Sequence, residues 1–172
     1  AGFFGNTPKY CRQCTSNSYC VGGGSRTQCQ AGASSQPGSS RQEDCVCNAG
    51  YTGSDGDACF PCESGKYKPA AGSEACTACP ANSNSPQGSI MVVSCICDEG
   101  YSGMNGDCEA CEAGKYKIME GNGDCEACLP GKYSSSVAAT SSTTCVDCPE
   151  GSTSGVASSA RTDCECVPPK FG

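Results

Sequence analysis

The chain has 172 residues, a net charge of −7 and no histidine, and its large apolar side chains include one Leu, three Ile, eight Val and four Phe. So few apolar side chains cannot bury enough surface to offset the conformational entropy of folding, which excludes an ordinary hydrophobic core. Twenty cysteines instead predict a disulfide scaffold, and therefore an oxidising location that is extracellular, secreted or at the cell surface. The acidic balance argues against nucleic acid as a partner.

Targeting and membrane segments are not evident in the sequence. No signal peptide begins at Ala1, which indicates a mature chain or an excised segment. The longest apolar run, Ile90–Val93, is far too short to cross a bilayer. We therefore expect no membrane span in this segment.

One cysteine spacing occurs three times along the chain. The pattern Cys-x15-Cys-x-Cys begins at Cys29, Cys79 and Cys148. The first two copies continue into an aromatic-Gly turn and a C-x-x-C pair. At the N-terminus AGFFGNTPKYC, residues 1–11, aligns without a gap on AGYTGSDGDAC, residues 49–59. Internal repetition at this period is typical of tandem arrays of small modules.

The repeat divides the chain into units in phase with one another. The boundaries that it predicts are 1–47, 48–97, 98–166 and 167–172. The third unit is longer because its CxxGKY…C submodule occurs twice, and the last segment is the start of a following unit or a junction between subunits.

Turns dominate the predicted secondary structure. The pairs Asp55-Gly56, Asn105-Gly106 and Asn122-Gly123 favour tight hairpin turns, and Ser89–Cys97 is the best candidate strand because β-branched residues lead into a C-x-C. No window has a helical apolar period, so almost no helix is expected. The predicted fold consists of small disulfide-rich repeats of short β-hairpins and loops, in an elongated, rod-like tandem array.

The repeated motifs resemble known extracellular modules. C-x-C-x2-G-Y-x-G, present at residues 45–53 and 95–103, resembles the last half of an EGF-like module. The CxxGKY…C and CPxxSxS…C segments that follow are similar to the ephrin-receptor-like cysteine-rich repeat and, more loosely, to the first half of a tumour-necrosis-factor-receptor repeat. The resemblance covers nearly the whole chain. It implies extracellular, elongated arrays found in receptors, matrix proteins and surface proteins of protists.

Twenty cysteines permit many pairings, and the resemblance together with the repeat frame implies a sequential one. The implied pairs are Cys14–Cys20, Cys29–Cys45, Cys47–Cys59, Cys62–Cys76, Cys79–Cys95, Cys97–Cys108, Cys111–Cys125, Cys128–Cys145 and Cys148–Cys164.

Two cysteines stay outside this scheme. In the repeat frame, Cys11 pairs with a C-x-C before the first residue, and Cys166 pairs with a C-x-x-C beyond the last. The hypothesis is head-to-tail continuity, either within a longer repeat chain or by a disulfide between copies, with Phe3 and Phe171 at the junction. The alternatives are that the first unit has a different disulfide connectivity or that both cysteines are free thiols.

Metal binding has weak sequence support. The C-x-x-C pairs within Cys59–Cys79 nearly match a four-cysteine zinc site, but the absence of histidine and the EGF-like turns argue against zinc. The acidic turns Asp55–Asp57 and Asn105–Asp107 are possible calcium ligands, although neither forms a complete set. No cofactor is therefore expected.

Tyrosines and hydroxyl-rich loops are the remaining candidates. The tyrosines favour packing on neighbouring disulfides as miniature cores over a ligand-binding stripe; they are Tyr51, Tyr67, Tyr101, Tyr116 and Tyr133. The loops are candidate O-glycan carriers at Ser134, Ser135, Ser136, Thr140, Ser141, Ser142, Thr143, Thr144, Ser152, Thr153 and Ser154.

These features predict a protein that is not an enzyme, because histidine, a nucleophile-elbow serine and a glycine-rich loop opening a helix are all missing. The favoured function is structural: an extracellular, O-glycosylated segment whose partner is itself, assembling head to tail into a filament, surface hair, matrix or coat. The alternative is a ligand-binding ectodomain segment of a cell-surface receptor. The absence of Trp and the likeness of the units favour the structural function.

Overall fold

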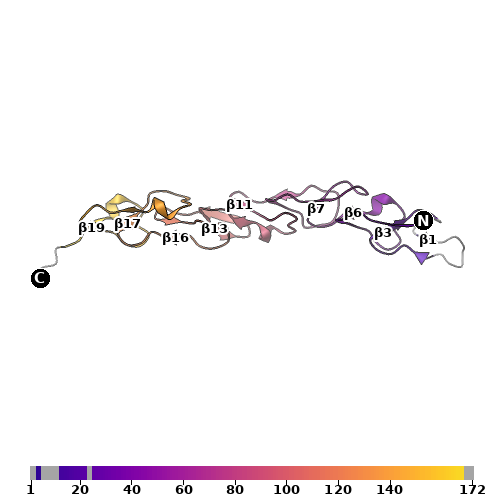
Figure 1. Cartoon of the computed structure of the whole chain (residues 1–172), viewed down its shortest axis with the longest axis horizontal. Coiled ribbons are helices and arrows are strands. Elements are labelled where there is room, and N and C mark those ends of the chain that lie inside the picture. Colours follow the sequence, from indigo (N-terminus) through magenta and orange to yellow (C-terminus); the bar gives the residue numbers. More distant parts are fainter. Residues whose placement is uncertain (1–2, 5–11, 23–24, 169–172) are drawn as a thin grey trace. The chain divides into compact units, whose positions relative to one another are not determined.

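The computed structural model describes residues 3–4, 12–22 and 25–168. The chain folds as two compact units, one formed by residues 1–79 with 85–94 and the other by residues 80–84 with 95–172. Within each unit, two-stranded antiparallel hairpins follow one another in chain order (Figure 1). The described residues contain no α-helix, only single 3-10 turns.

The strands and turns are short throughout. The first unit contains β1 (Phe3–Phe4), β2 (Arg12–Gln13), β3 (Ser18–Cys20), β4 (Arg26–Gln28), β5 (Ala33–Ser34), η1 (Gln42–Asp44), β6 (Val46–Cys47), β7 (Tyr51–Thr52), β8 (Phe60–Pro61), β9 (Lys66–Tyr67), β10 (Thr77–Ala78) and η2 (Val92–Ser94). The second contains β11 (Ser83–Asn84), β12 (Ile96–Cys97), β13 (Tyr101–Met104), β14 (Asp107–Ala110), β15 (Lys115–Tyr116), β16 (Glu126–Ala127), β17 (Lys132–Tyr133), η3 (Ser142–Thr144), β18 (Val146–Asp147), β19 (Ser152–Thr153), η4 (Arg161–Asp163) and β20 (Glu165–Cys166).

Disulfides connect the hairpins in tandem, sequential order. They join Cys14–Cys20, Cys29–Cys45, Cys47–Cys59, Cys62–Cys76, Cys97–Cys108, Cys111–Cys125, Cys128–Cys145 and Cys148–Cys164, and Cys79 and Cys95 are also disulfide-bonded. The predicted fold class, disulfide-rich repeats of short hairpins with almost no helix, is confirmed.

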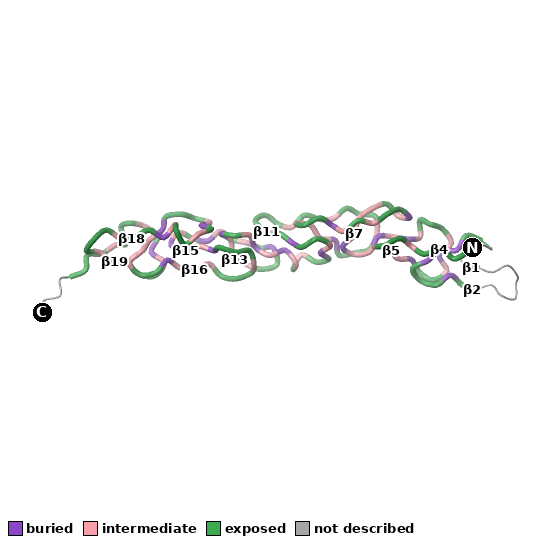
Figure 2. The backbone as a smooth tube through the Cα atoms, viewed as in Figure 1, coloured by how far each residue is buried: buried purple, intermediate pink, exposed green. Residues whose placement is uncertain are grey.

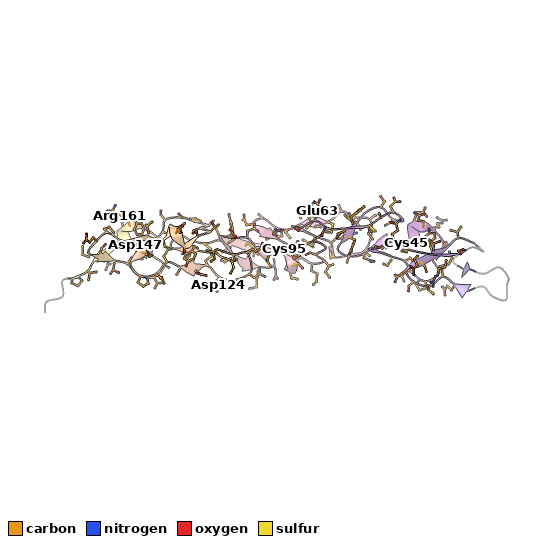
Figure 3. All side chains as sticks on the ribbon, viewed as in Figure 1. Cys45, Glu63, Cys95, Asp124, Asp147 and Arg161 are labelled. Atoms are coloured by element: carbon orange, nitrogen blue, oxygen red, sulfur yellow. A yellow bond between two sulfur atoms is a disulfide. The ribbon has the colours of Figure 1, made fainter. Side chains whose placement is uncertain are left out.

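Sulfur and small polar side chains fill the interior of each unit. The largest fully buried side chains are Cys14, Cys20, Cys47, Cys62, Cys95, Cys97, Cys111, Cys128, Ser18 and Ser134. Large apolar side chains lie outside instead: Phe60 is 65% exposed and Leu129 68%. Figure 2 shows buried residues only as short stretches between exposed ones, and Figure 3 shows charged side chains such as Glu63 and Asp124 at the surface. Disulfides therefore occupy the place of a hydrophobic core.

Backbone hydrogen bonds connect each hairpin to the next within a unit. The amide of Gly65 donates to the carbonyl of Ser85 at 2.9 Å, and that of Gly114 donates to Ser134 at 2.7 Å. Both glycines have left-handed φ angles, 77° and 85°, which turn the amide toward the following hairpin. Single parallel bridges repeat at Tyr67 with Ser89, Tyr116 with Ala139 and Tyr133 with Ser158. These bonds fix the register of successive hairpins.

The predicted strand at Ser89–Cys97 is wrong over most of its length. Only Ile96–Cys97 is a strand, while Val92–Ser94 forms the 3-10 turn η2. The turns η1, η3 and η4 occupy the corresponding position, directly before a disulfide-bonded cysteine. The backbone path of the repeat, closed by the next disulfide, therefore prevails over the strand propensity of β-branched residues.

Two of the three predicted turns are confirmed. Asn105 and Gly106, with φ angles of 58° and 81°, join β13 to β14 in a two-residue hairpin turn. Asp55-Gly56 forms a turn closed by a hydrogen bond from the Asp57 amide to the Ser54 carbonyl, within the loop between β7 and β8. Asn122-Gly123 is not such a turn, since neither residue has a positive φ. The long loop between β15 and β16 is held instead by the Lys117 ammonium, which donates to the Gly121 carbonyl.

These amide hydrogen bonds between successive hairpins, called the ladder below, predict that a side chain at Gly114 lowers stability. A Cβ atom there lies 2.2 Å from the Ala157 carbonyl oxygen, at a φ that L-residues rarely adopt. We expect Gly114→Ala to lower the free energy of unfolding by about 1–3 kcal/mol, measured by denaturant unfolding with disulfides intact. Gly123→Ala is the matched control, because its Cβ meets nothing within 4 Å and its φ is ordinary. Equal stabilities of the two variants contradict the ladder.

Candidate functional site

The second cysteine of each C-x-C occupies the same place in its hairpin. Cys47 in β6, Cys97 in β12 and Cys166 in β20 each lie opposite the first residue of the preceding strand. The backbone therefore presents these three sulfur positions in the same register.

Their bonding states differ. Cys47 bonds to Cys59 twelve residues downstream, and Cys97 bonds to Cys108 eleven residues downstream. Both Cys47 and Cys97 are fully buried. In the part of the chain that the structure describes, Cys166 is free and exposed. It presents a thiol where the repeat elsewhere forms a disulfide to the following hairpin.

The opposite end of the chain has the backbone pairing of a mid-repeat hairpin. Phe3 pairs with Gln13 in β1–β2 as Tyr51 pairs with Pro61 in β7–β8. This is the register that the gapless alignment of residues 1–11 on 49–59 predicts. Of Phe3 only the backbone is described, and the predicted junction residues Cys11 and Phe171 lie outside the described residues.

Two buried lysines brace the loops, and sequence reasoning missed both. Lys68 and Lys117 are only 3% and 7% exposed. The Lys117 ammonium donates to the Tyr101 carbonyl at 2.6 Å and to the Gly121 carbonyl, and Lys68 binds the equivalent carbonyls in the first unit. Each ammonium thereby ties the loop closed by Cys62–Cys76 or Cys111–Cys125 back to the preceding aromatic-Gly turn.

Burial changes the acid–base behaviour of this bracing group. Desolvation lowers the pKa of Lys117, and the Asp98 carboxylate opposes part of that effect. Other turns have small side chains at the corresponding position, such as the buried Ser134 and the disulfide-bonded Cys20. The sequence carried no signal that these lysines are buried, because short and long side chains share this fourth turn position.

The cysteines proposed as zinc ligands are all occupied. Cys59 bonds to Cys47, Cys62 bonds to Cys76, and Cys79 is disulfide-bonded, so none of them is free as a thiolate. Among the described residues, no group of three or more His, Cys, Asp or Glu side chains could hold a metal ion.

The candidate O-glycan carriers fall into buried and accessible sets. Ser134 and Ser154 are 1% and 7% exposed, and the Ser154 hydroxyl donates to the Lys132 carbonyl at 2.8 Å. Both side chains are therefore buried in the folded chain, and O-glycosylation at these positions stays a prediction. The exposed candidates are Ser135, Ser136, Thr140, Ser142, Thr143 and Thr153, and the half-buried ones are Ser141, Thr144 and Ser152.

The five tyrosines singled out in the sequence are all half-buried. The Tyr51 ring covers Gly32 so closely that a Cβ there lies 2.5 Å from a ring carbon. A hydrogen bond with the Glu126 carboxylate across the β15–β16 hairpin raises the pKa of Tyr116. These rings contribute to contacts within and between hairpins.

None of the helical turns in the described part has the length and apolarity that crossing a membrane requires. The protein-family model for tyrosine-protein kinase ephrin type A/B receptor-like repeats matches residues 50–95 and 100–145, together more than half of the chain. Each matched segment begins at a left-handed glycine and ends at a disulfide-bonded cysteine. No curated protein matches the chain significantly.

The lysine brace makes a prediction about stability. We expect Lys117→Met to lower the free energy of unfolding by about 1–3 kcal/mol, because the Tyr101 and Gly121 carbonyls lose their charged donor. In the control Lys115→Met, an exposed ion pair with Glu112 is lost, and the change stays within about 0.5 kcal/mol. Denaturant unfolding measures both. A loss no greater for the buried lysine than for the exposed one rules out the brace.

Proposed function

Because the chain belongs to the ephrin type A/B receptor-like cysteine-rich repeat family, we propose that it is a non-enzymatic, structural segment of an extracellular protein. The tandem disulfides support an extracellular location. The absence of histidine from the chain supports a role without acid–base chemistry.

The free Cys166 carries the finer proposal. It holds the position from which Cys47 and Cys97 bond to the next hairpin. Its partner is a cysteine of a following cysteine-rich segment, in the same polypeptide or in a neighbouring copy. Joined in this way, the repeats continue in phase, head to tail, as a filament, surface hair, matrix or coat.

Exposed hydroxyl-bearing loops fit such a role. Thr140, Ser142 and Thr143 are exposed in the segment that leads into η3. O-glycans on these residues shield the backbone edges without disturbing the disulfide-lined interior.

A receptor ectodomain is the second candidate. The family description names a receptor, and Phe60 on β8 is exposed in the manner of a binding anchor. In that case the segment spaces or presents a ligand site, and Cys166 bonds within the same polypeptide.

Disulfide mapping of native material tests the junction. Free thiols are alkylated before non-reducing proteolysis, and the peptide containing Cys166 is identified by mass spectrometry. We expect it linked to a cysteine of a C-x-x-C segment, and we expect Cys166→Ser to remove every covalent multimer of the secreted chain. Recovery of Cys166 alkylated, in monomeric native protein, overturns the proposal.

The control moves the thiol to another exposed site. Cys166→Ser combined with Ser136→Cys retains one exposed thiol in the same unit but takes it out of the repeat register. If the displaced thiol forms multimers as efficiently as Cys166, cross-linking reflects exposure alone and the junction is not specific.

A further inference from the structure

An apolar corner stands out on the first unit. Ile90–Val93, called the apolar corner below, leads from the buried Ser89 into η2. Ile90, Met91 and Val93 are 45%, 50% and 48% exposed. Ile90 lies beside Gly50 of its own unit, and Val92 is half-buried.

The fold does not require apolar residues at this corner. The corresponding corners, which end in η1, η3 and η4, have the sequences SRQE at residues 40–43, TSST at 140–143 and SART at 159–162. All three are built from polar residues apart from one alanine, on the same backbone turn. A contiguous apolar patch that folding does not need marks an interaction surface.

The charge distribution indicates which partner fits. The chain has a net charge of −7, yet no charged residue occurs between Glu74 and Asp98. Two copies of an acidic protein repel one another over most of their surfaces, and residues 85–94 of the first unit, which carry no charge, are where they can approach. The stretch itself contains no Lys or Arg of the kind that anionic lipid attracts.

We propose that the apolar corner Ile90–Val93 docks against the same corner of a second copy of this chain, as a lateral contact between neighbouring segments. The inference rests on the proposed structural role and adds sideways association to it. A stable dimer buries about 800 Å² on each partner, far more than four partly exposed side chains provide. A single contact is therefore weak, so that the isolated chain dimerises reversibly and only at high protein concentration, and repetition along an array strengthens the association.

The test uses the full chain with free thiols alkylated, so that disulfide junctions do not contribute. Sedimentation velocity over a rising concentration series should show reversible dimers. The variant carrying Ile90→Thr, Met91→Ser, Val92→Ser and Val93→Thr adopts the residues of corner 140–143, which the same backbone already accommodates. We expect dimerisation at least about tenfold weaker, because the centre of the interface is lost.

A matched control changes apolar residues elsewhere. Ile118→Thr with Met119→Ser removes side chains that are 46% and 69% exposed in the second unit, and should leave dimerisation unchanged. Disulfide mapping of all three proteins verifies that they are folded alike.

Three results overturn the inference: a monomer at every concentration, dimerisation unaffected by the corner variant, or loss of dimerisation in the control as well. Binding of the unaltered chain, but not the corner variant, to neutral phosphatidylcholine vesicles without self-association assigns the corner to a lipid surface instead. Because the Cys166 junction is tested by covalent linkage and this contact by non-covalent association, the two proposals fail separately.

Discussion

The series of disulfides along the chain is the constraint on which the rest of this structure depends. Cysteines such as Cys62, Cys97 and Cys128 are the fully buried side chains, while Leu129 and Phe60 face solvent. In the chain-entropy model a bridge closing about 15 residues contributes roughly 3 kcal/mol, so a series of them replaces a hydrophobic core. The left-handed turns and the amide bonds between hairpins form because sulfur holds the chain ends of each loop together.

A fold held by sulfur leaves its surface free to vary. The four corners before a disulfide-bonded cysteine share a backbone turn, but only Ile90–Val93 is apolar. The fourth residue of the turn is equally permissive, since Lys117, Ser134 and Cys20 all occupy it while buried. Loop bracing, and the roles that we propose for Ile90–Val93 and Cys166, thus require changes to only a few side chains on a constant backbone frame.

The cysteine spacing made the hairpins and their sequential order predictable, because the second cysteine of each C-x-C recurs at one position in the repeat. Local propensity failed at Ser89–Cys97, where β-branched residues lie in a turn imposed by the repeat. The burial of Lys117 was beyond prediction because its two carbonyl partners converge from separate loops. At Cys166, the repeat frame predicts a bond to a following cysteine, and the structure adds an exposed thiol in the same register as Cys47 and Cys97.

Amide hydrogen exchange before and after full reduction and alkylation tests most directly whether sulfur holds the fold. In the oxidised chain, the ladder amides of Gly65 and Gly114 donate to the following hairpin and should be protected. After reduction we predict that protection disappears along both units, because no apolar core remains to hold the hairpins. Protection that persists at these amides in the reduced chain contradicts the account.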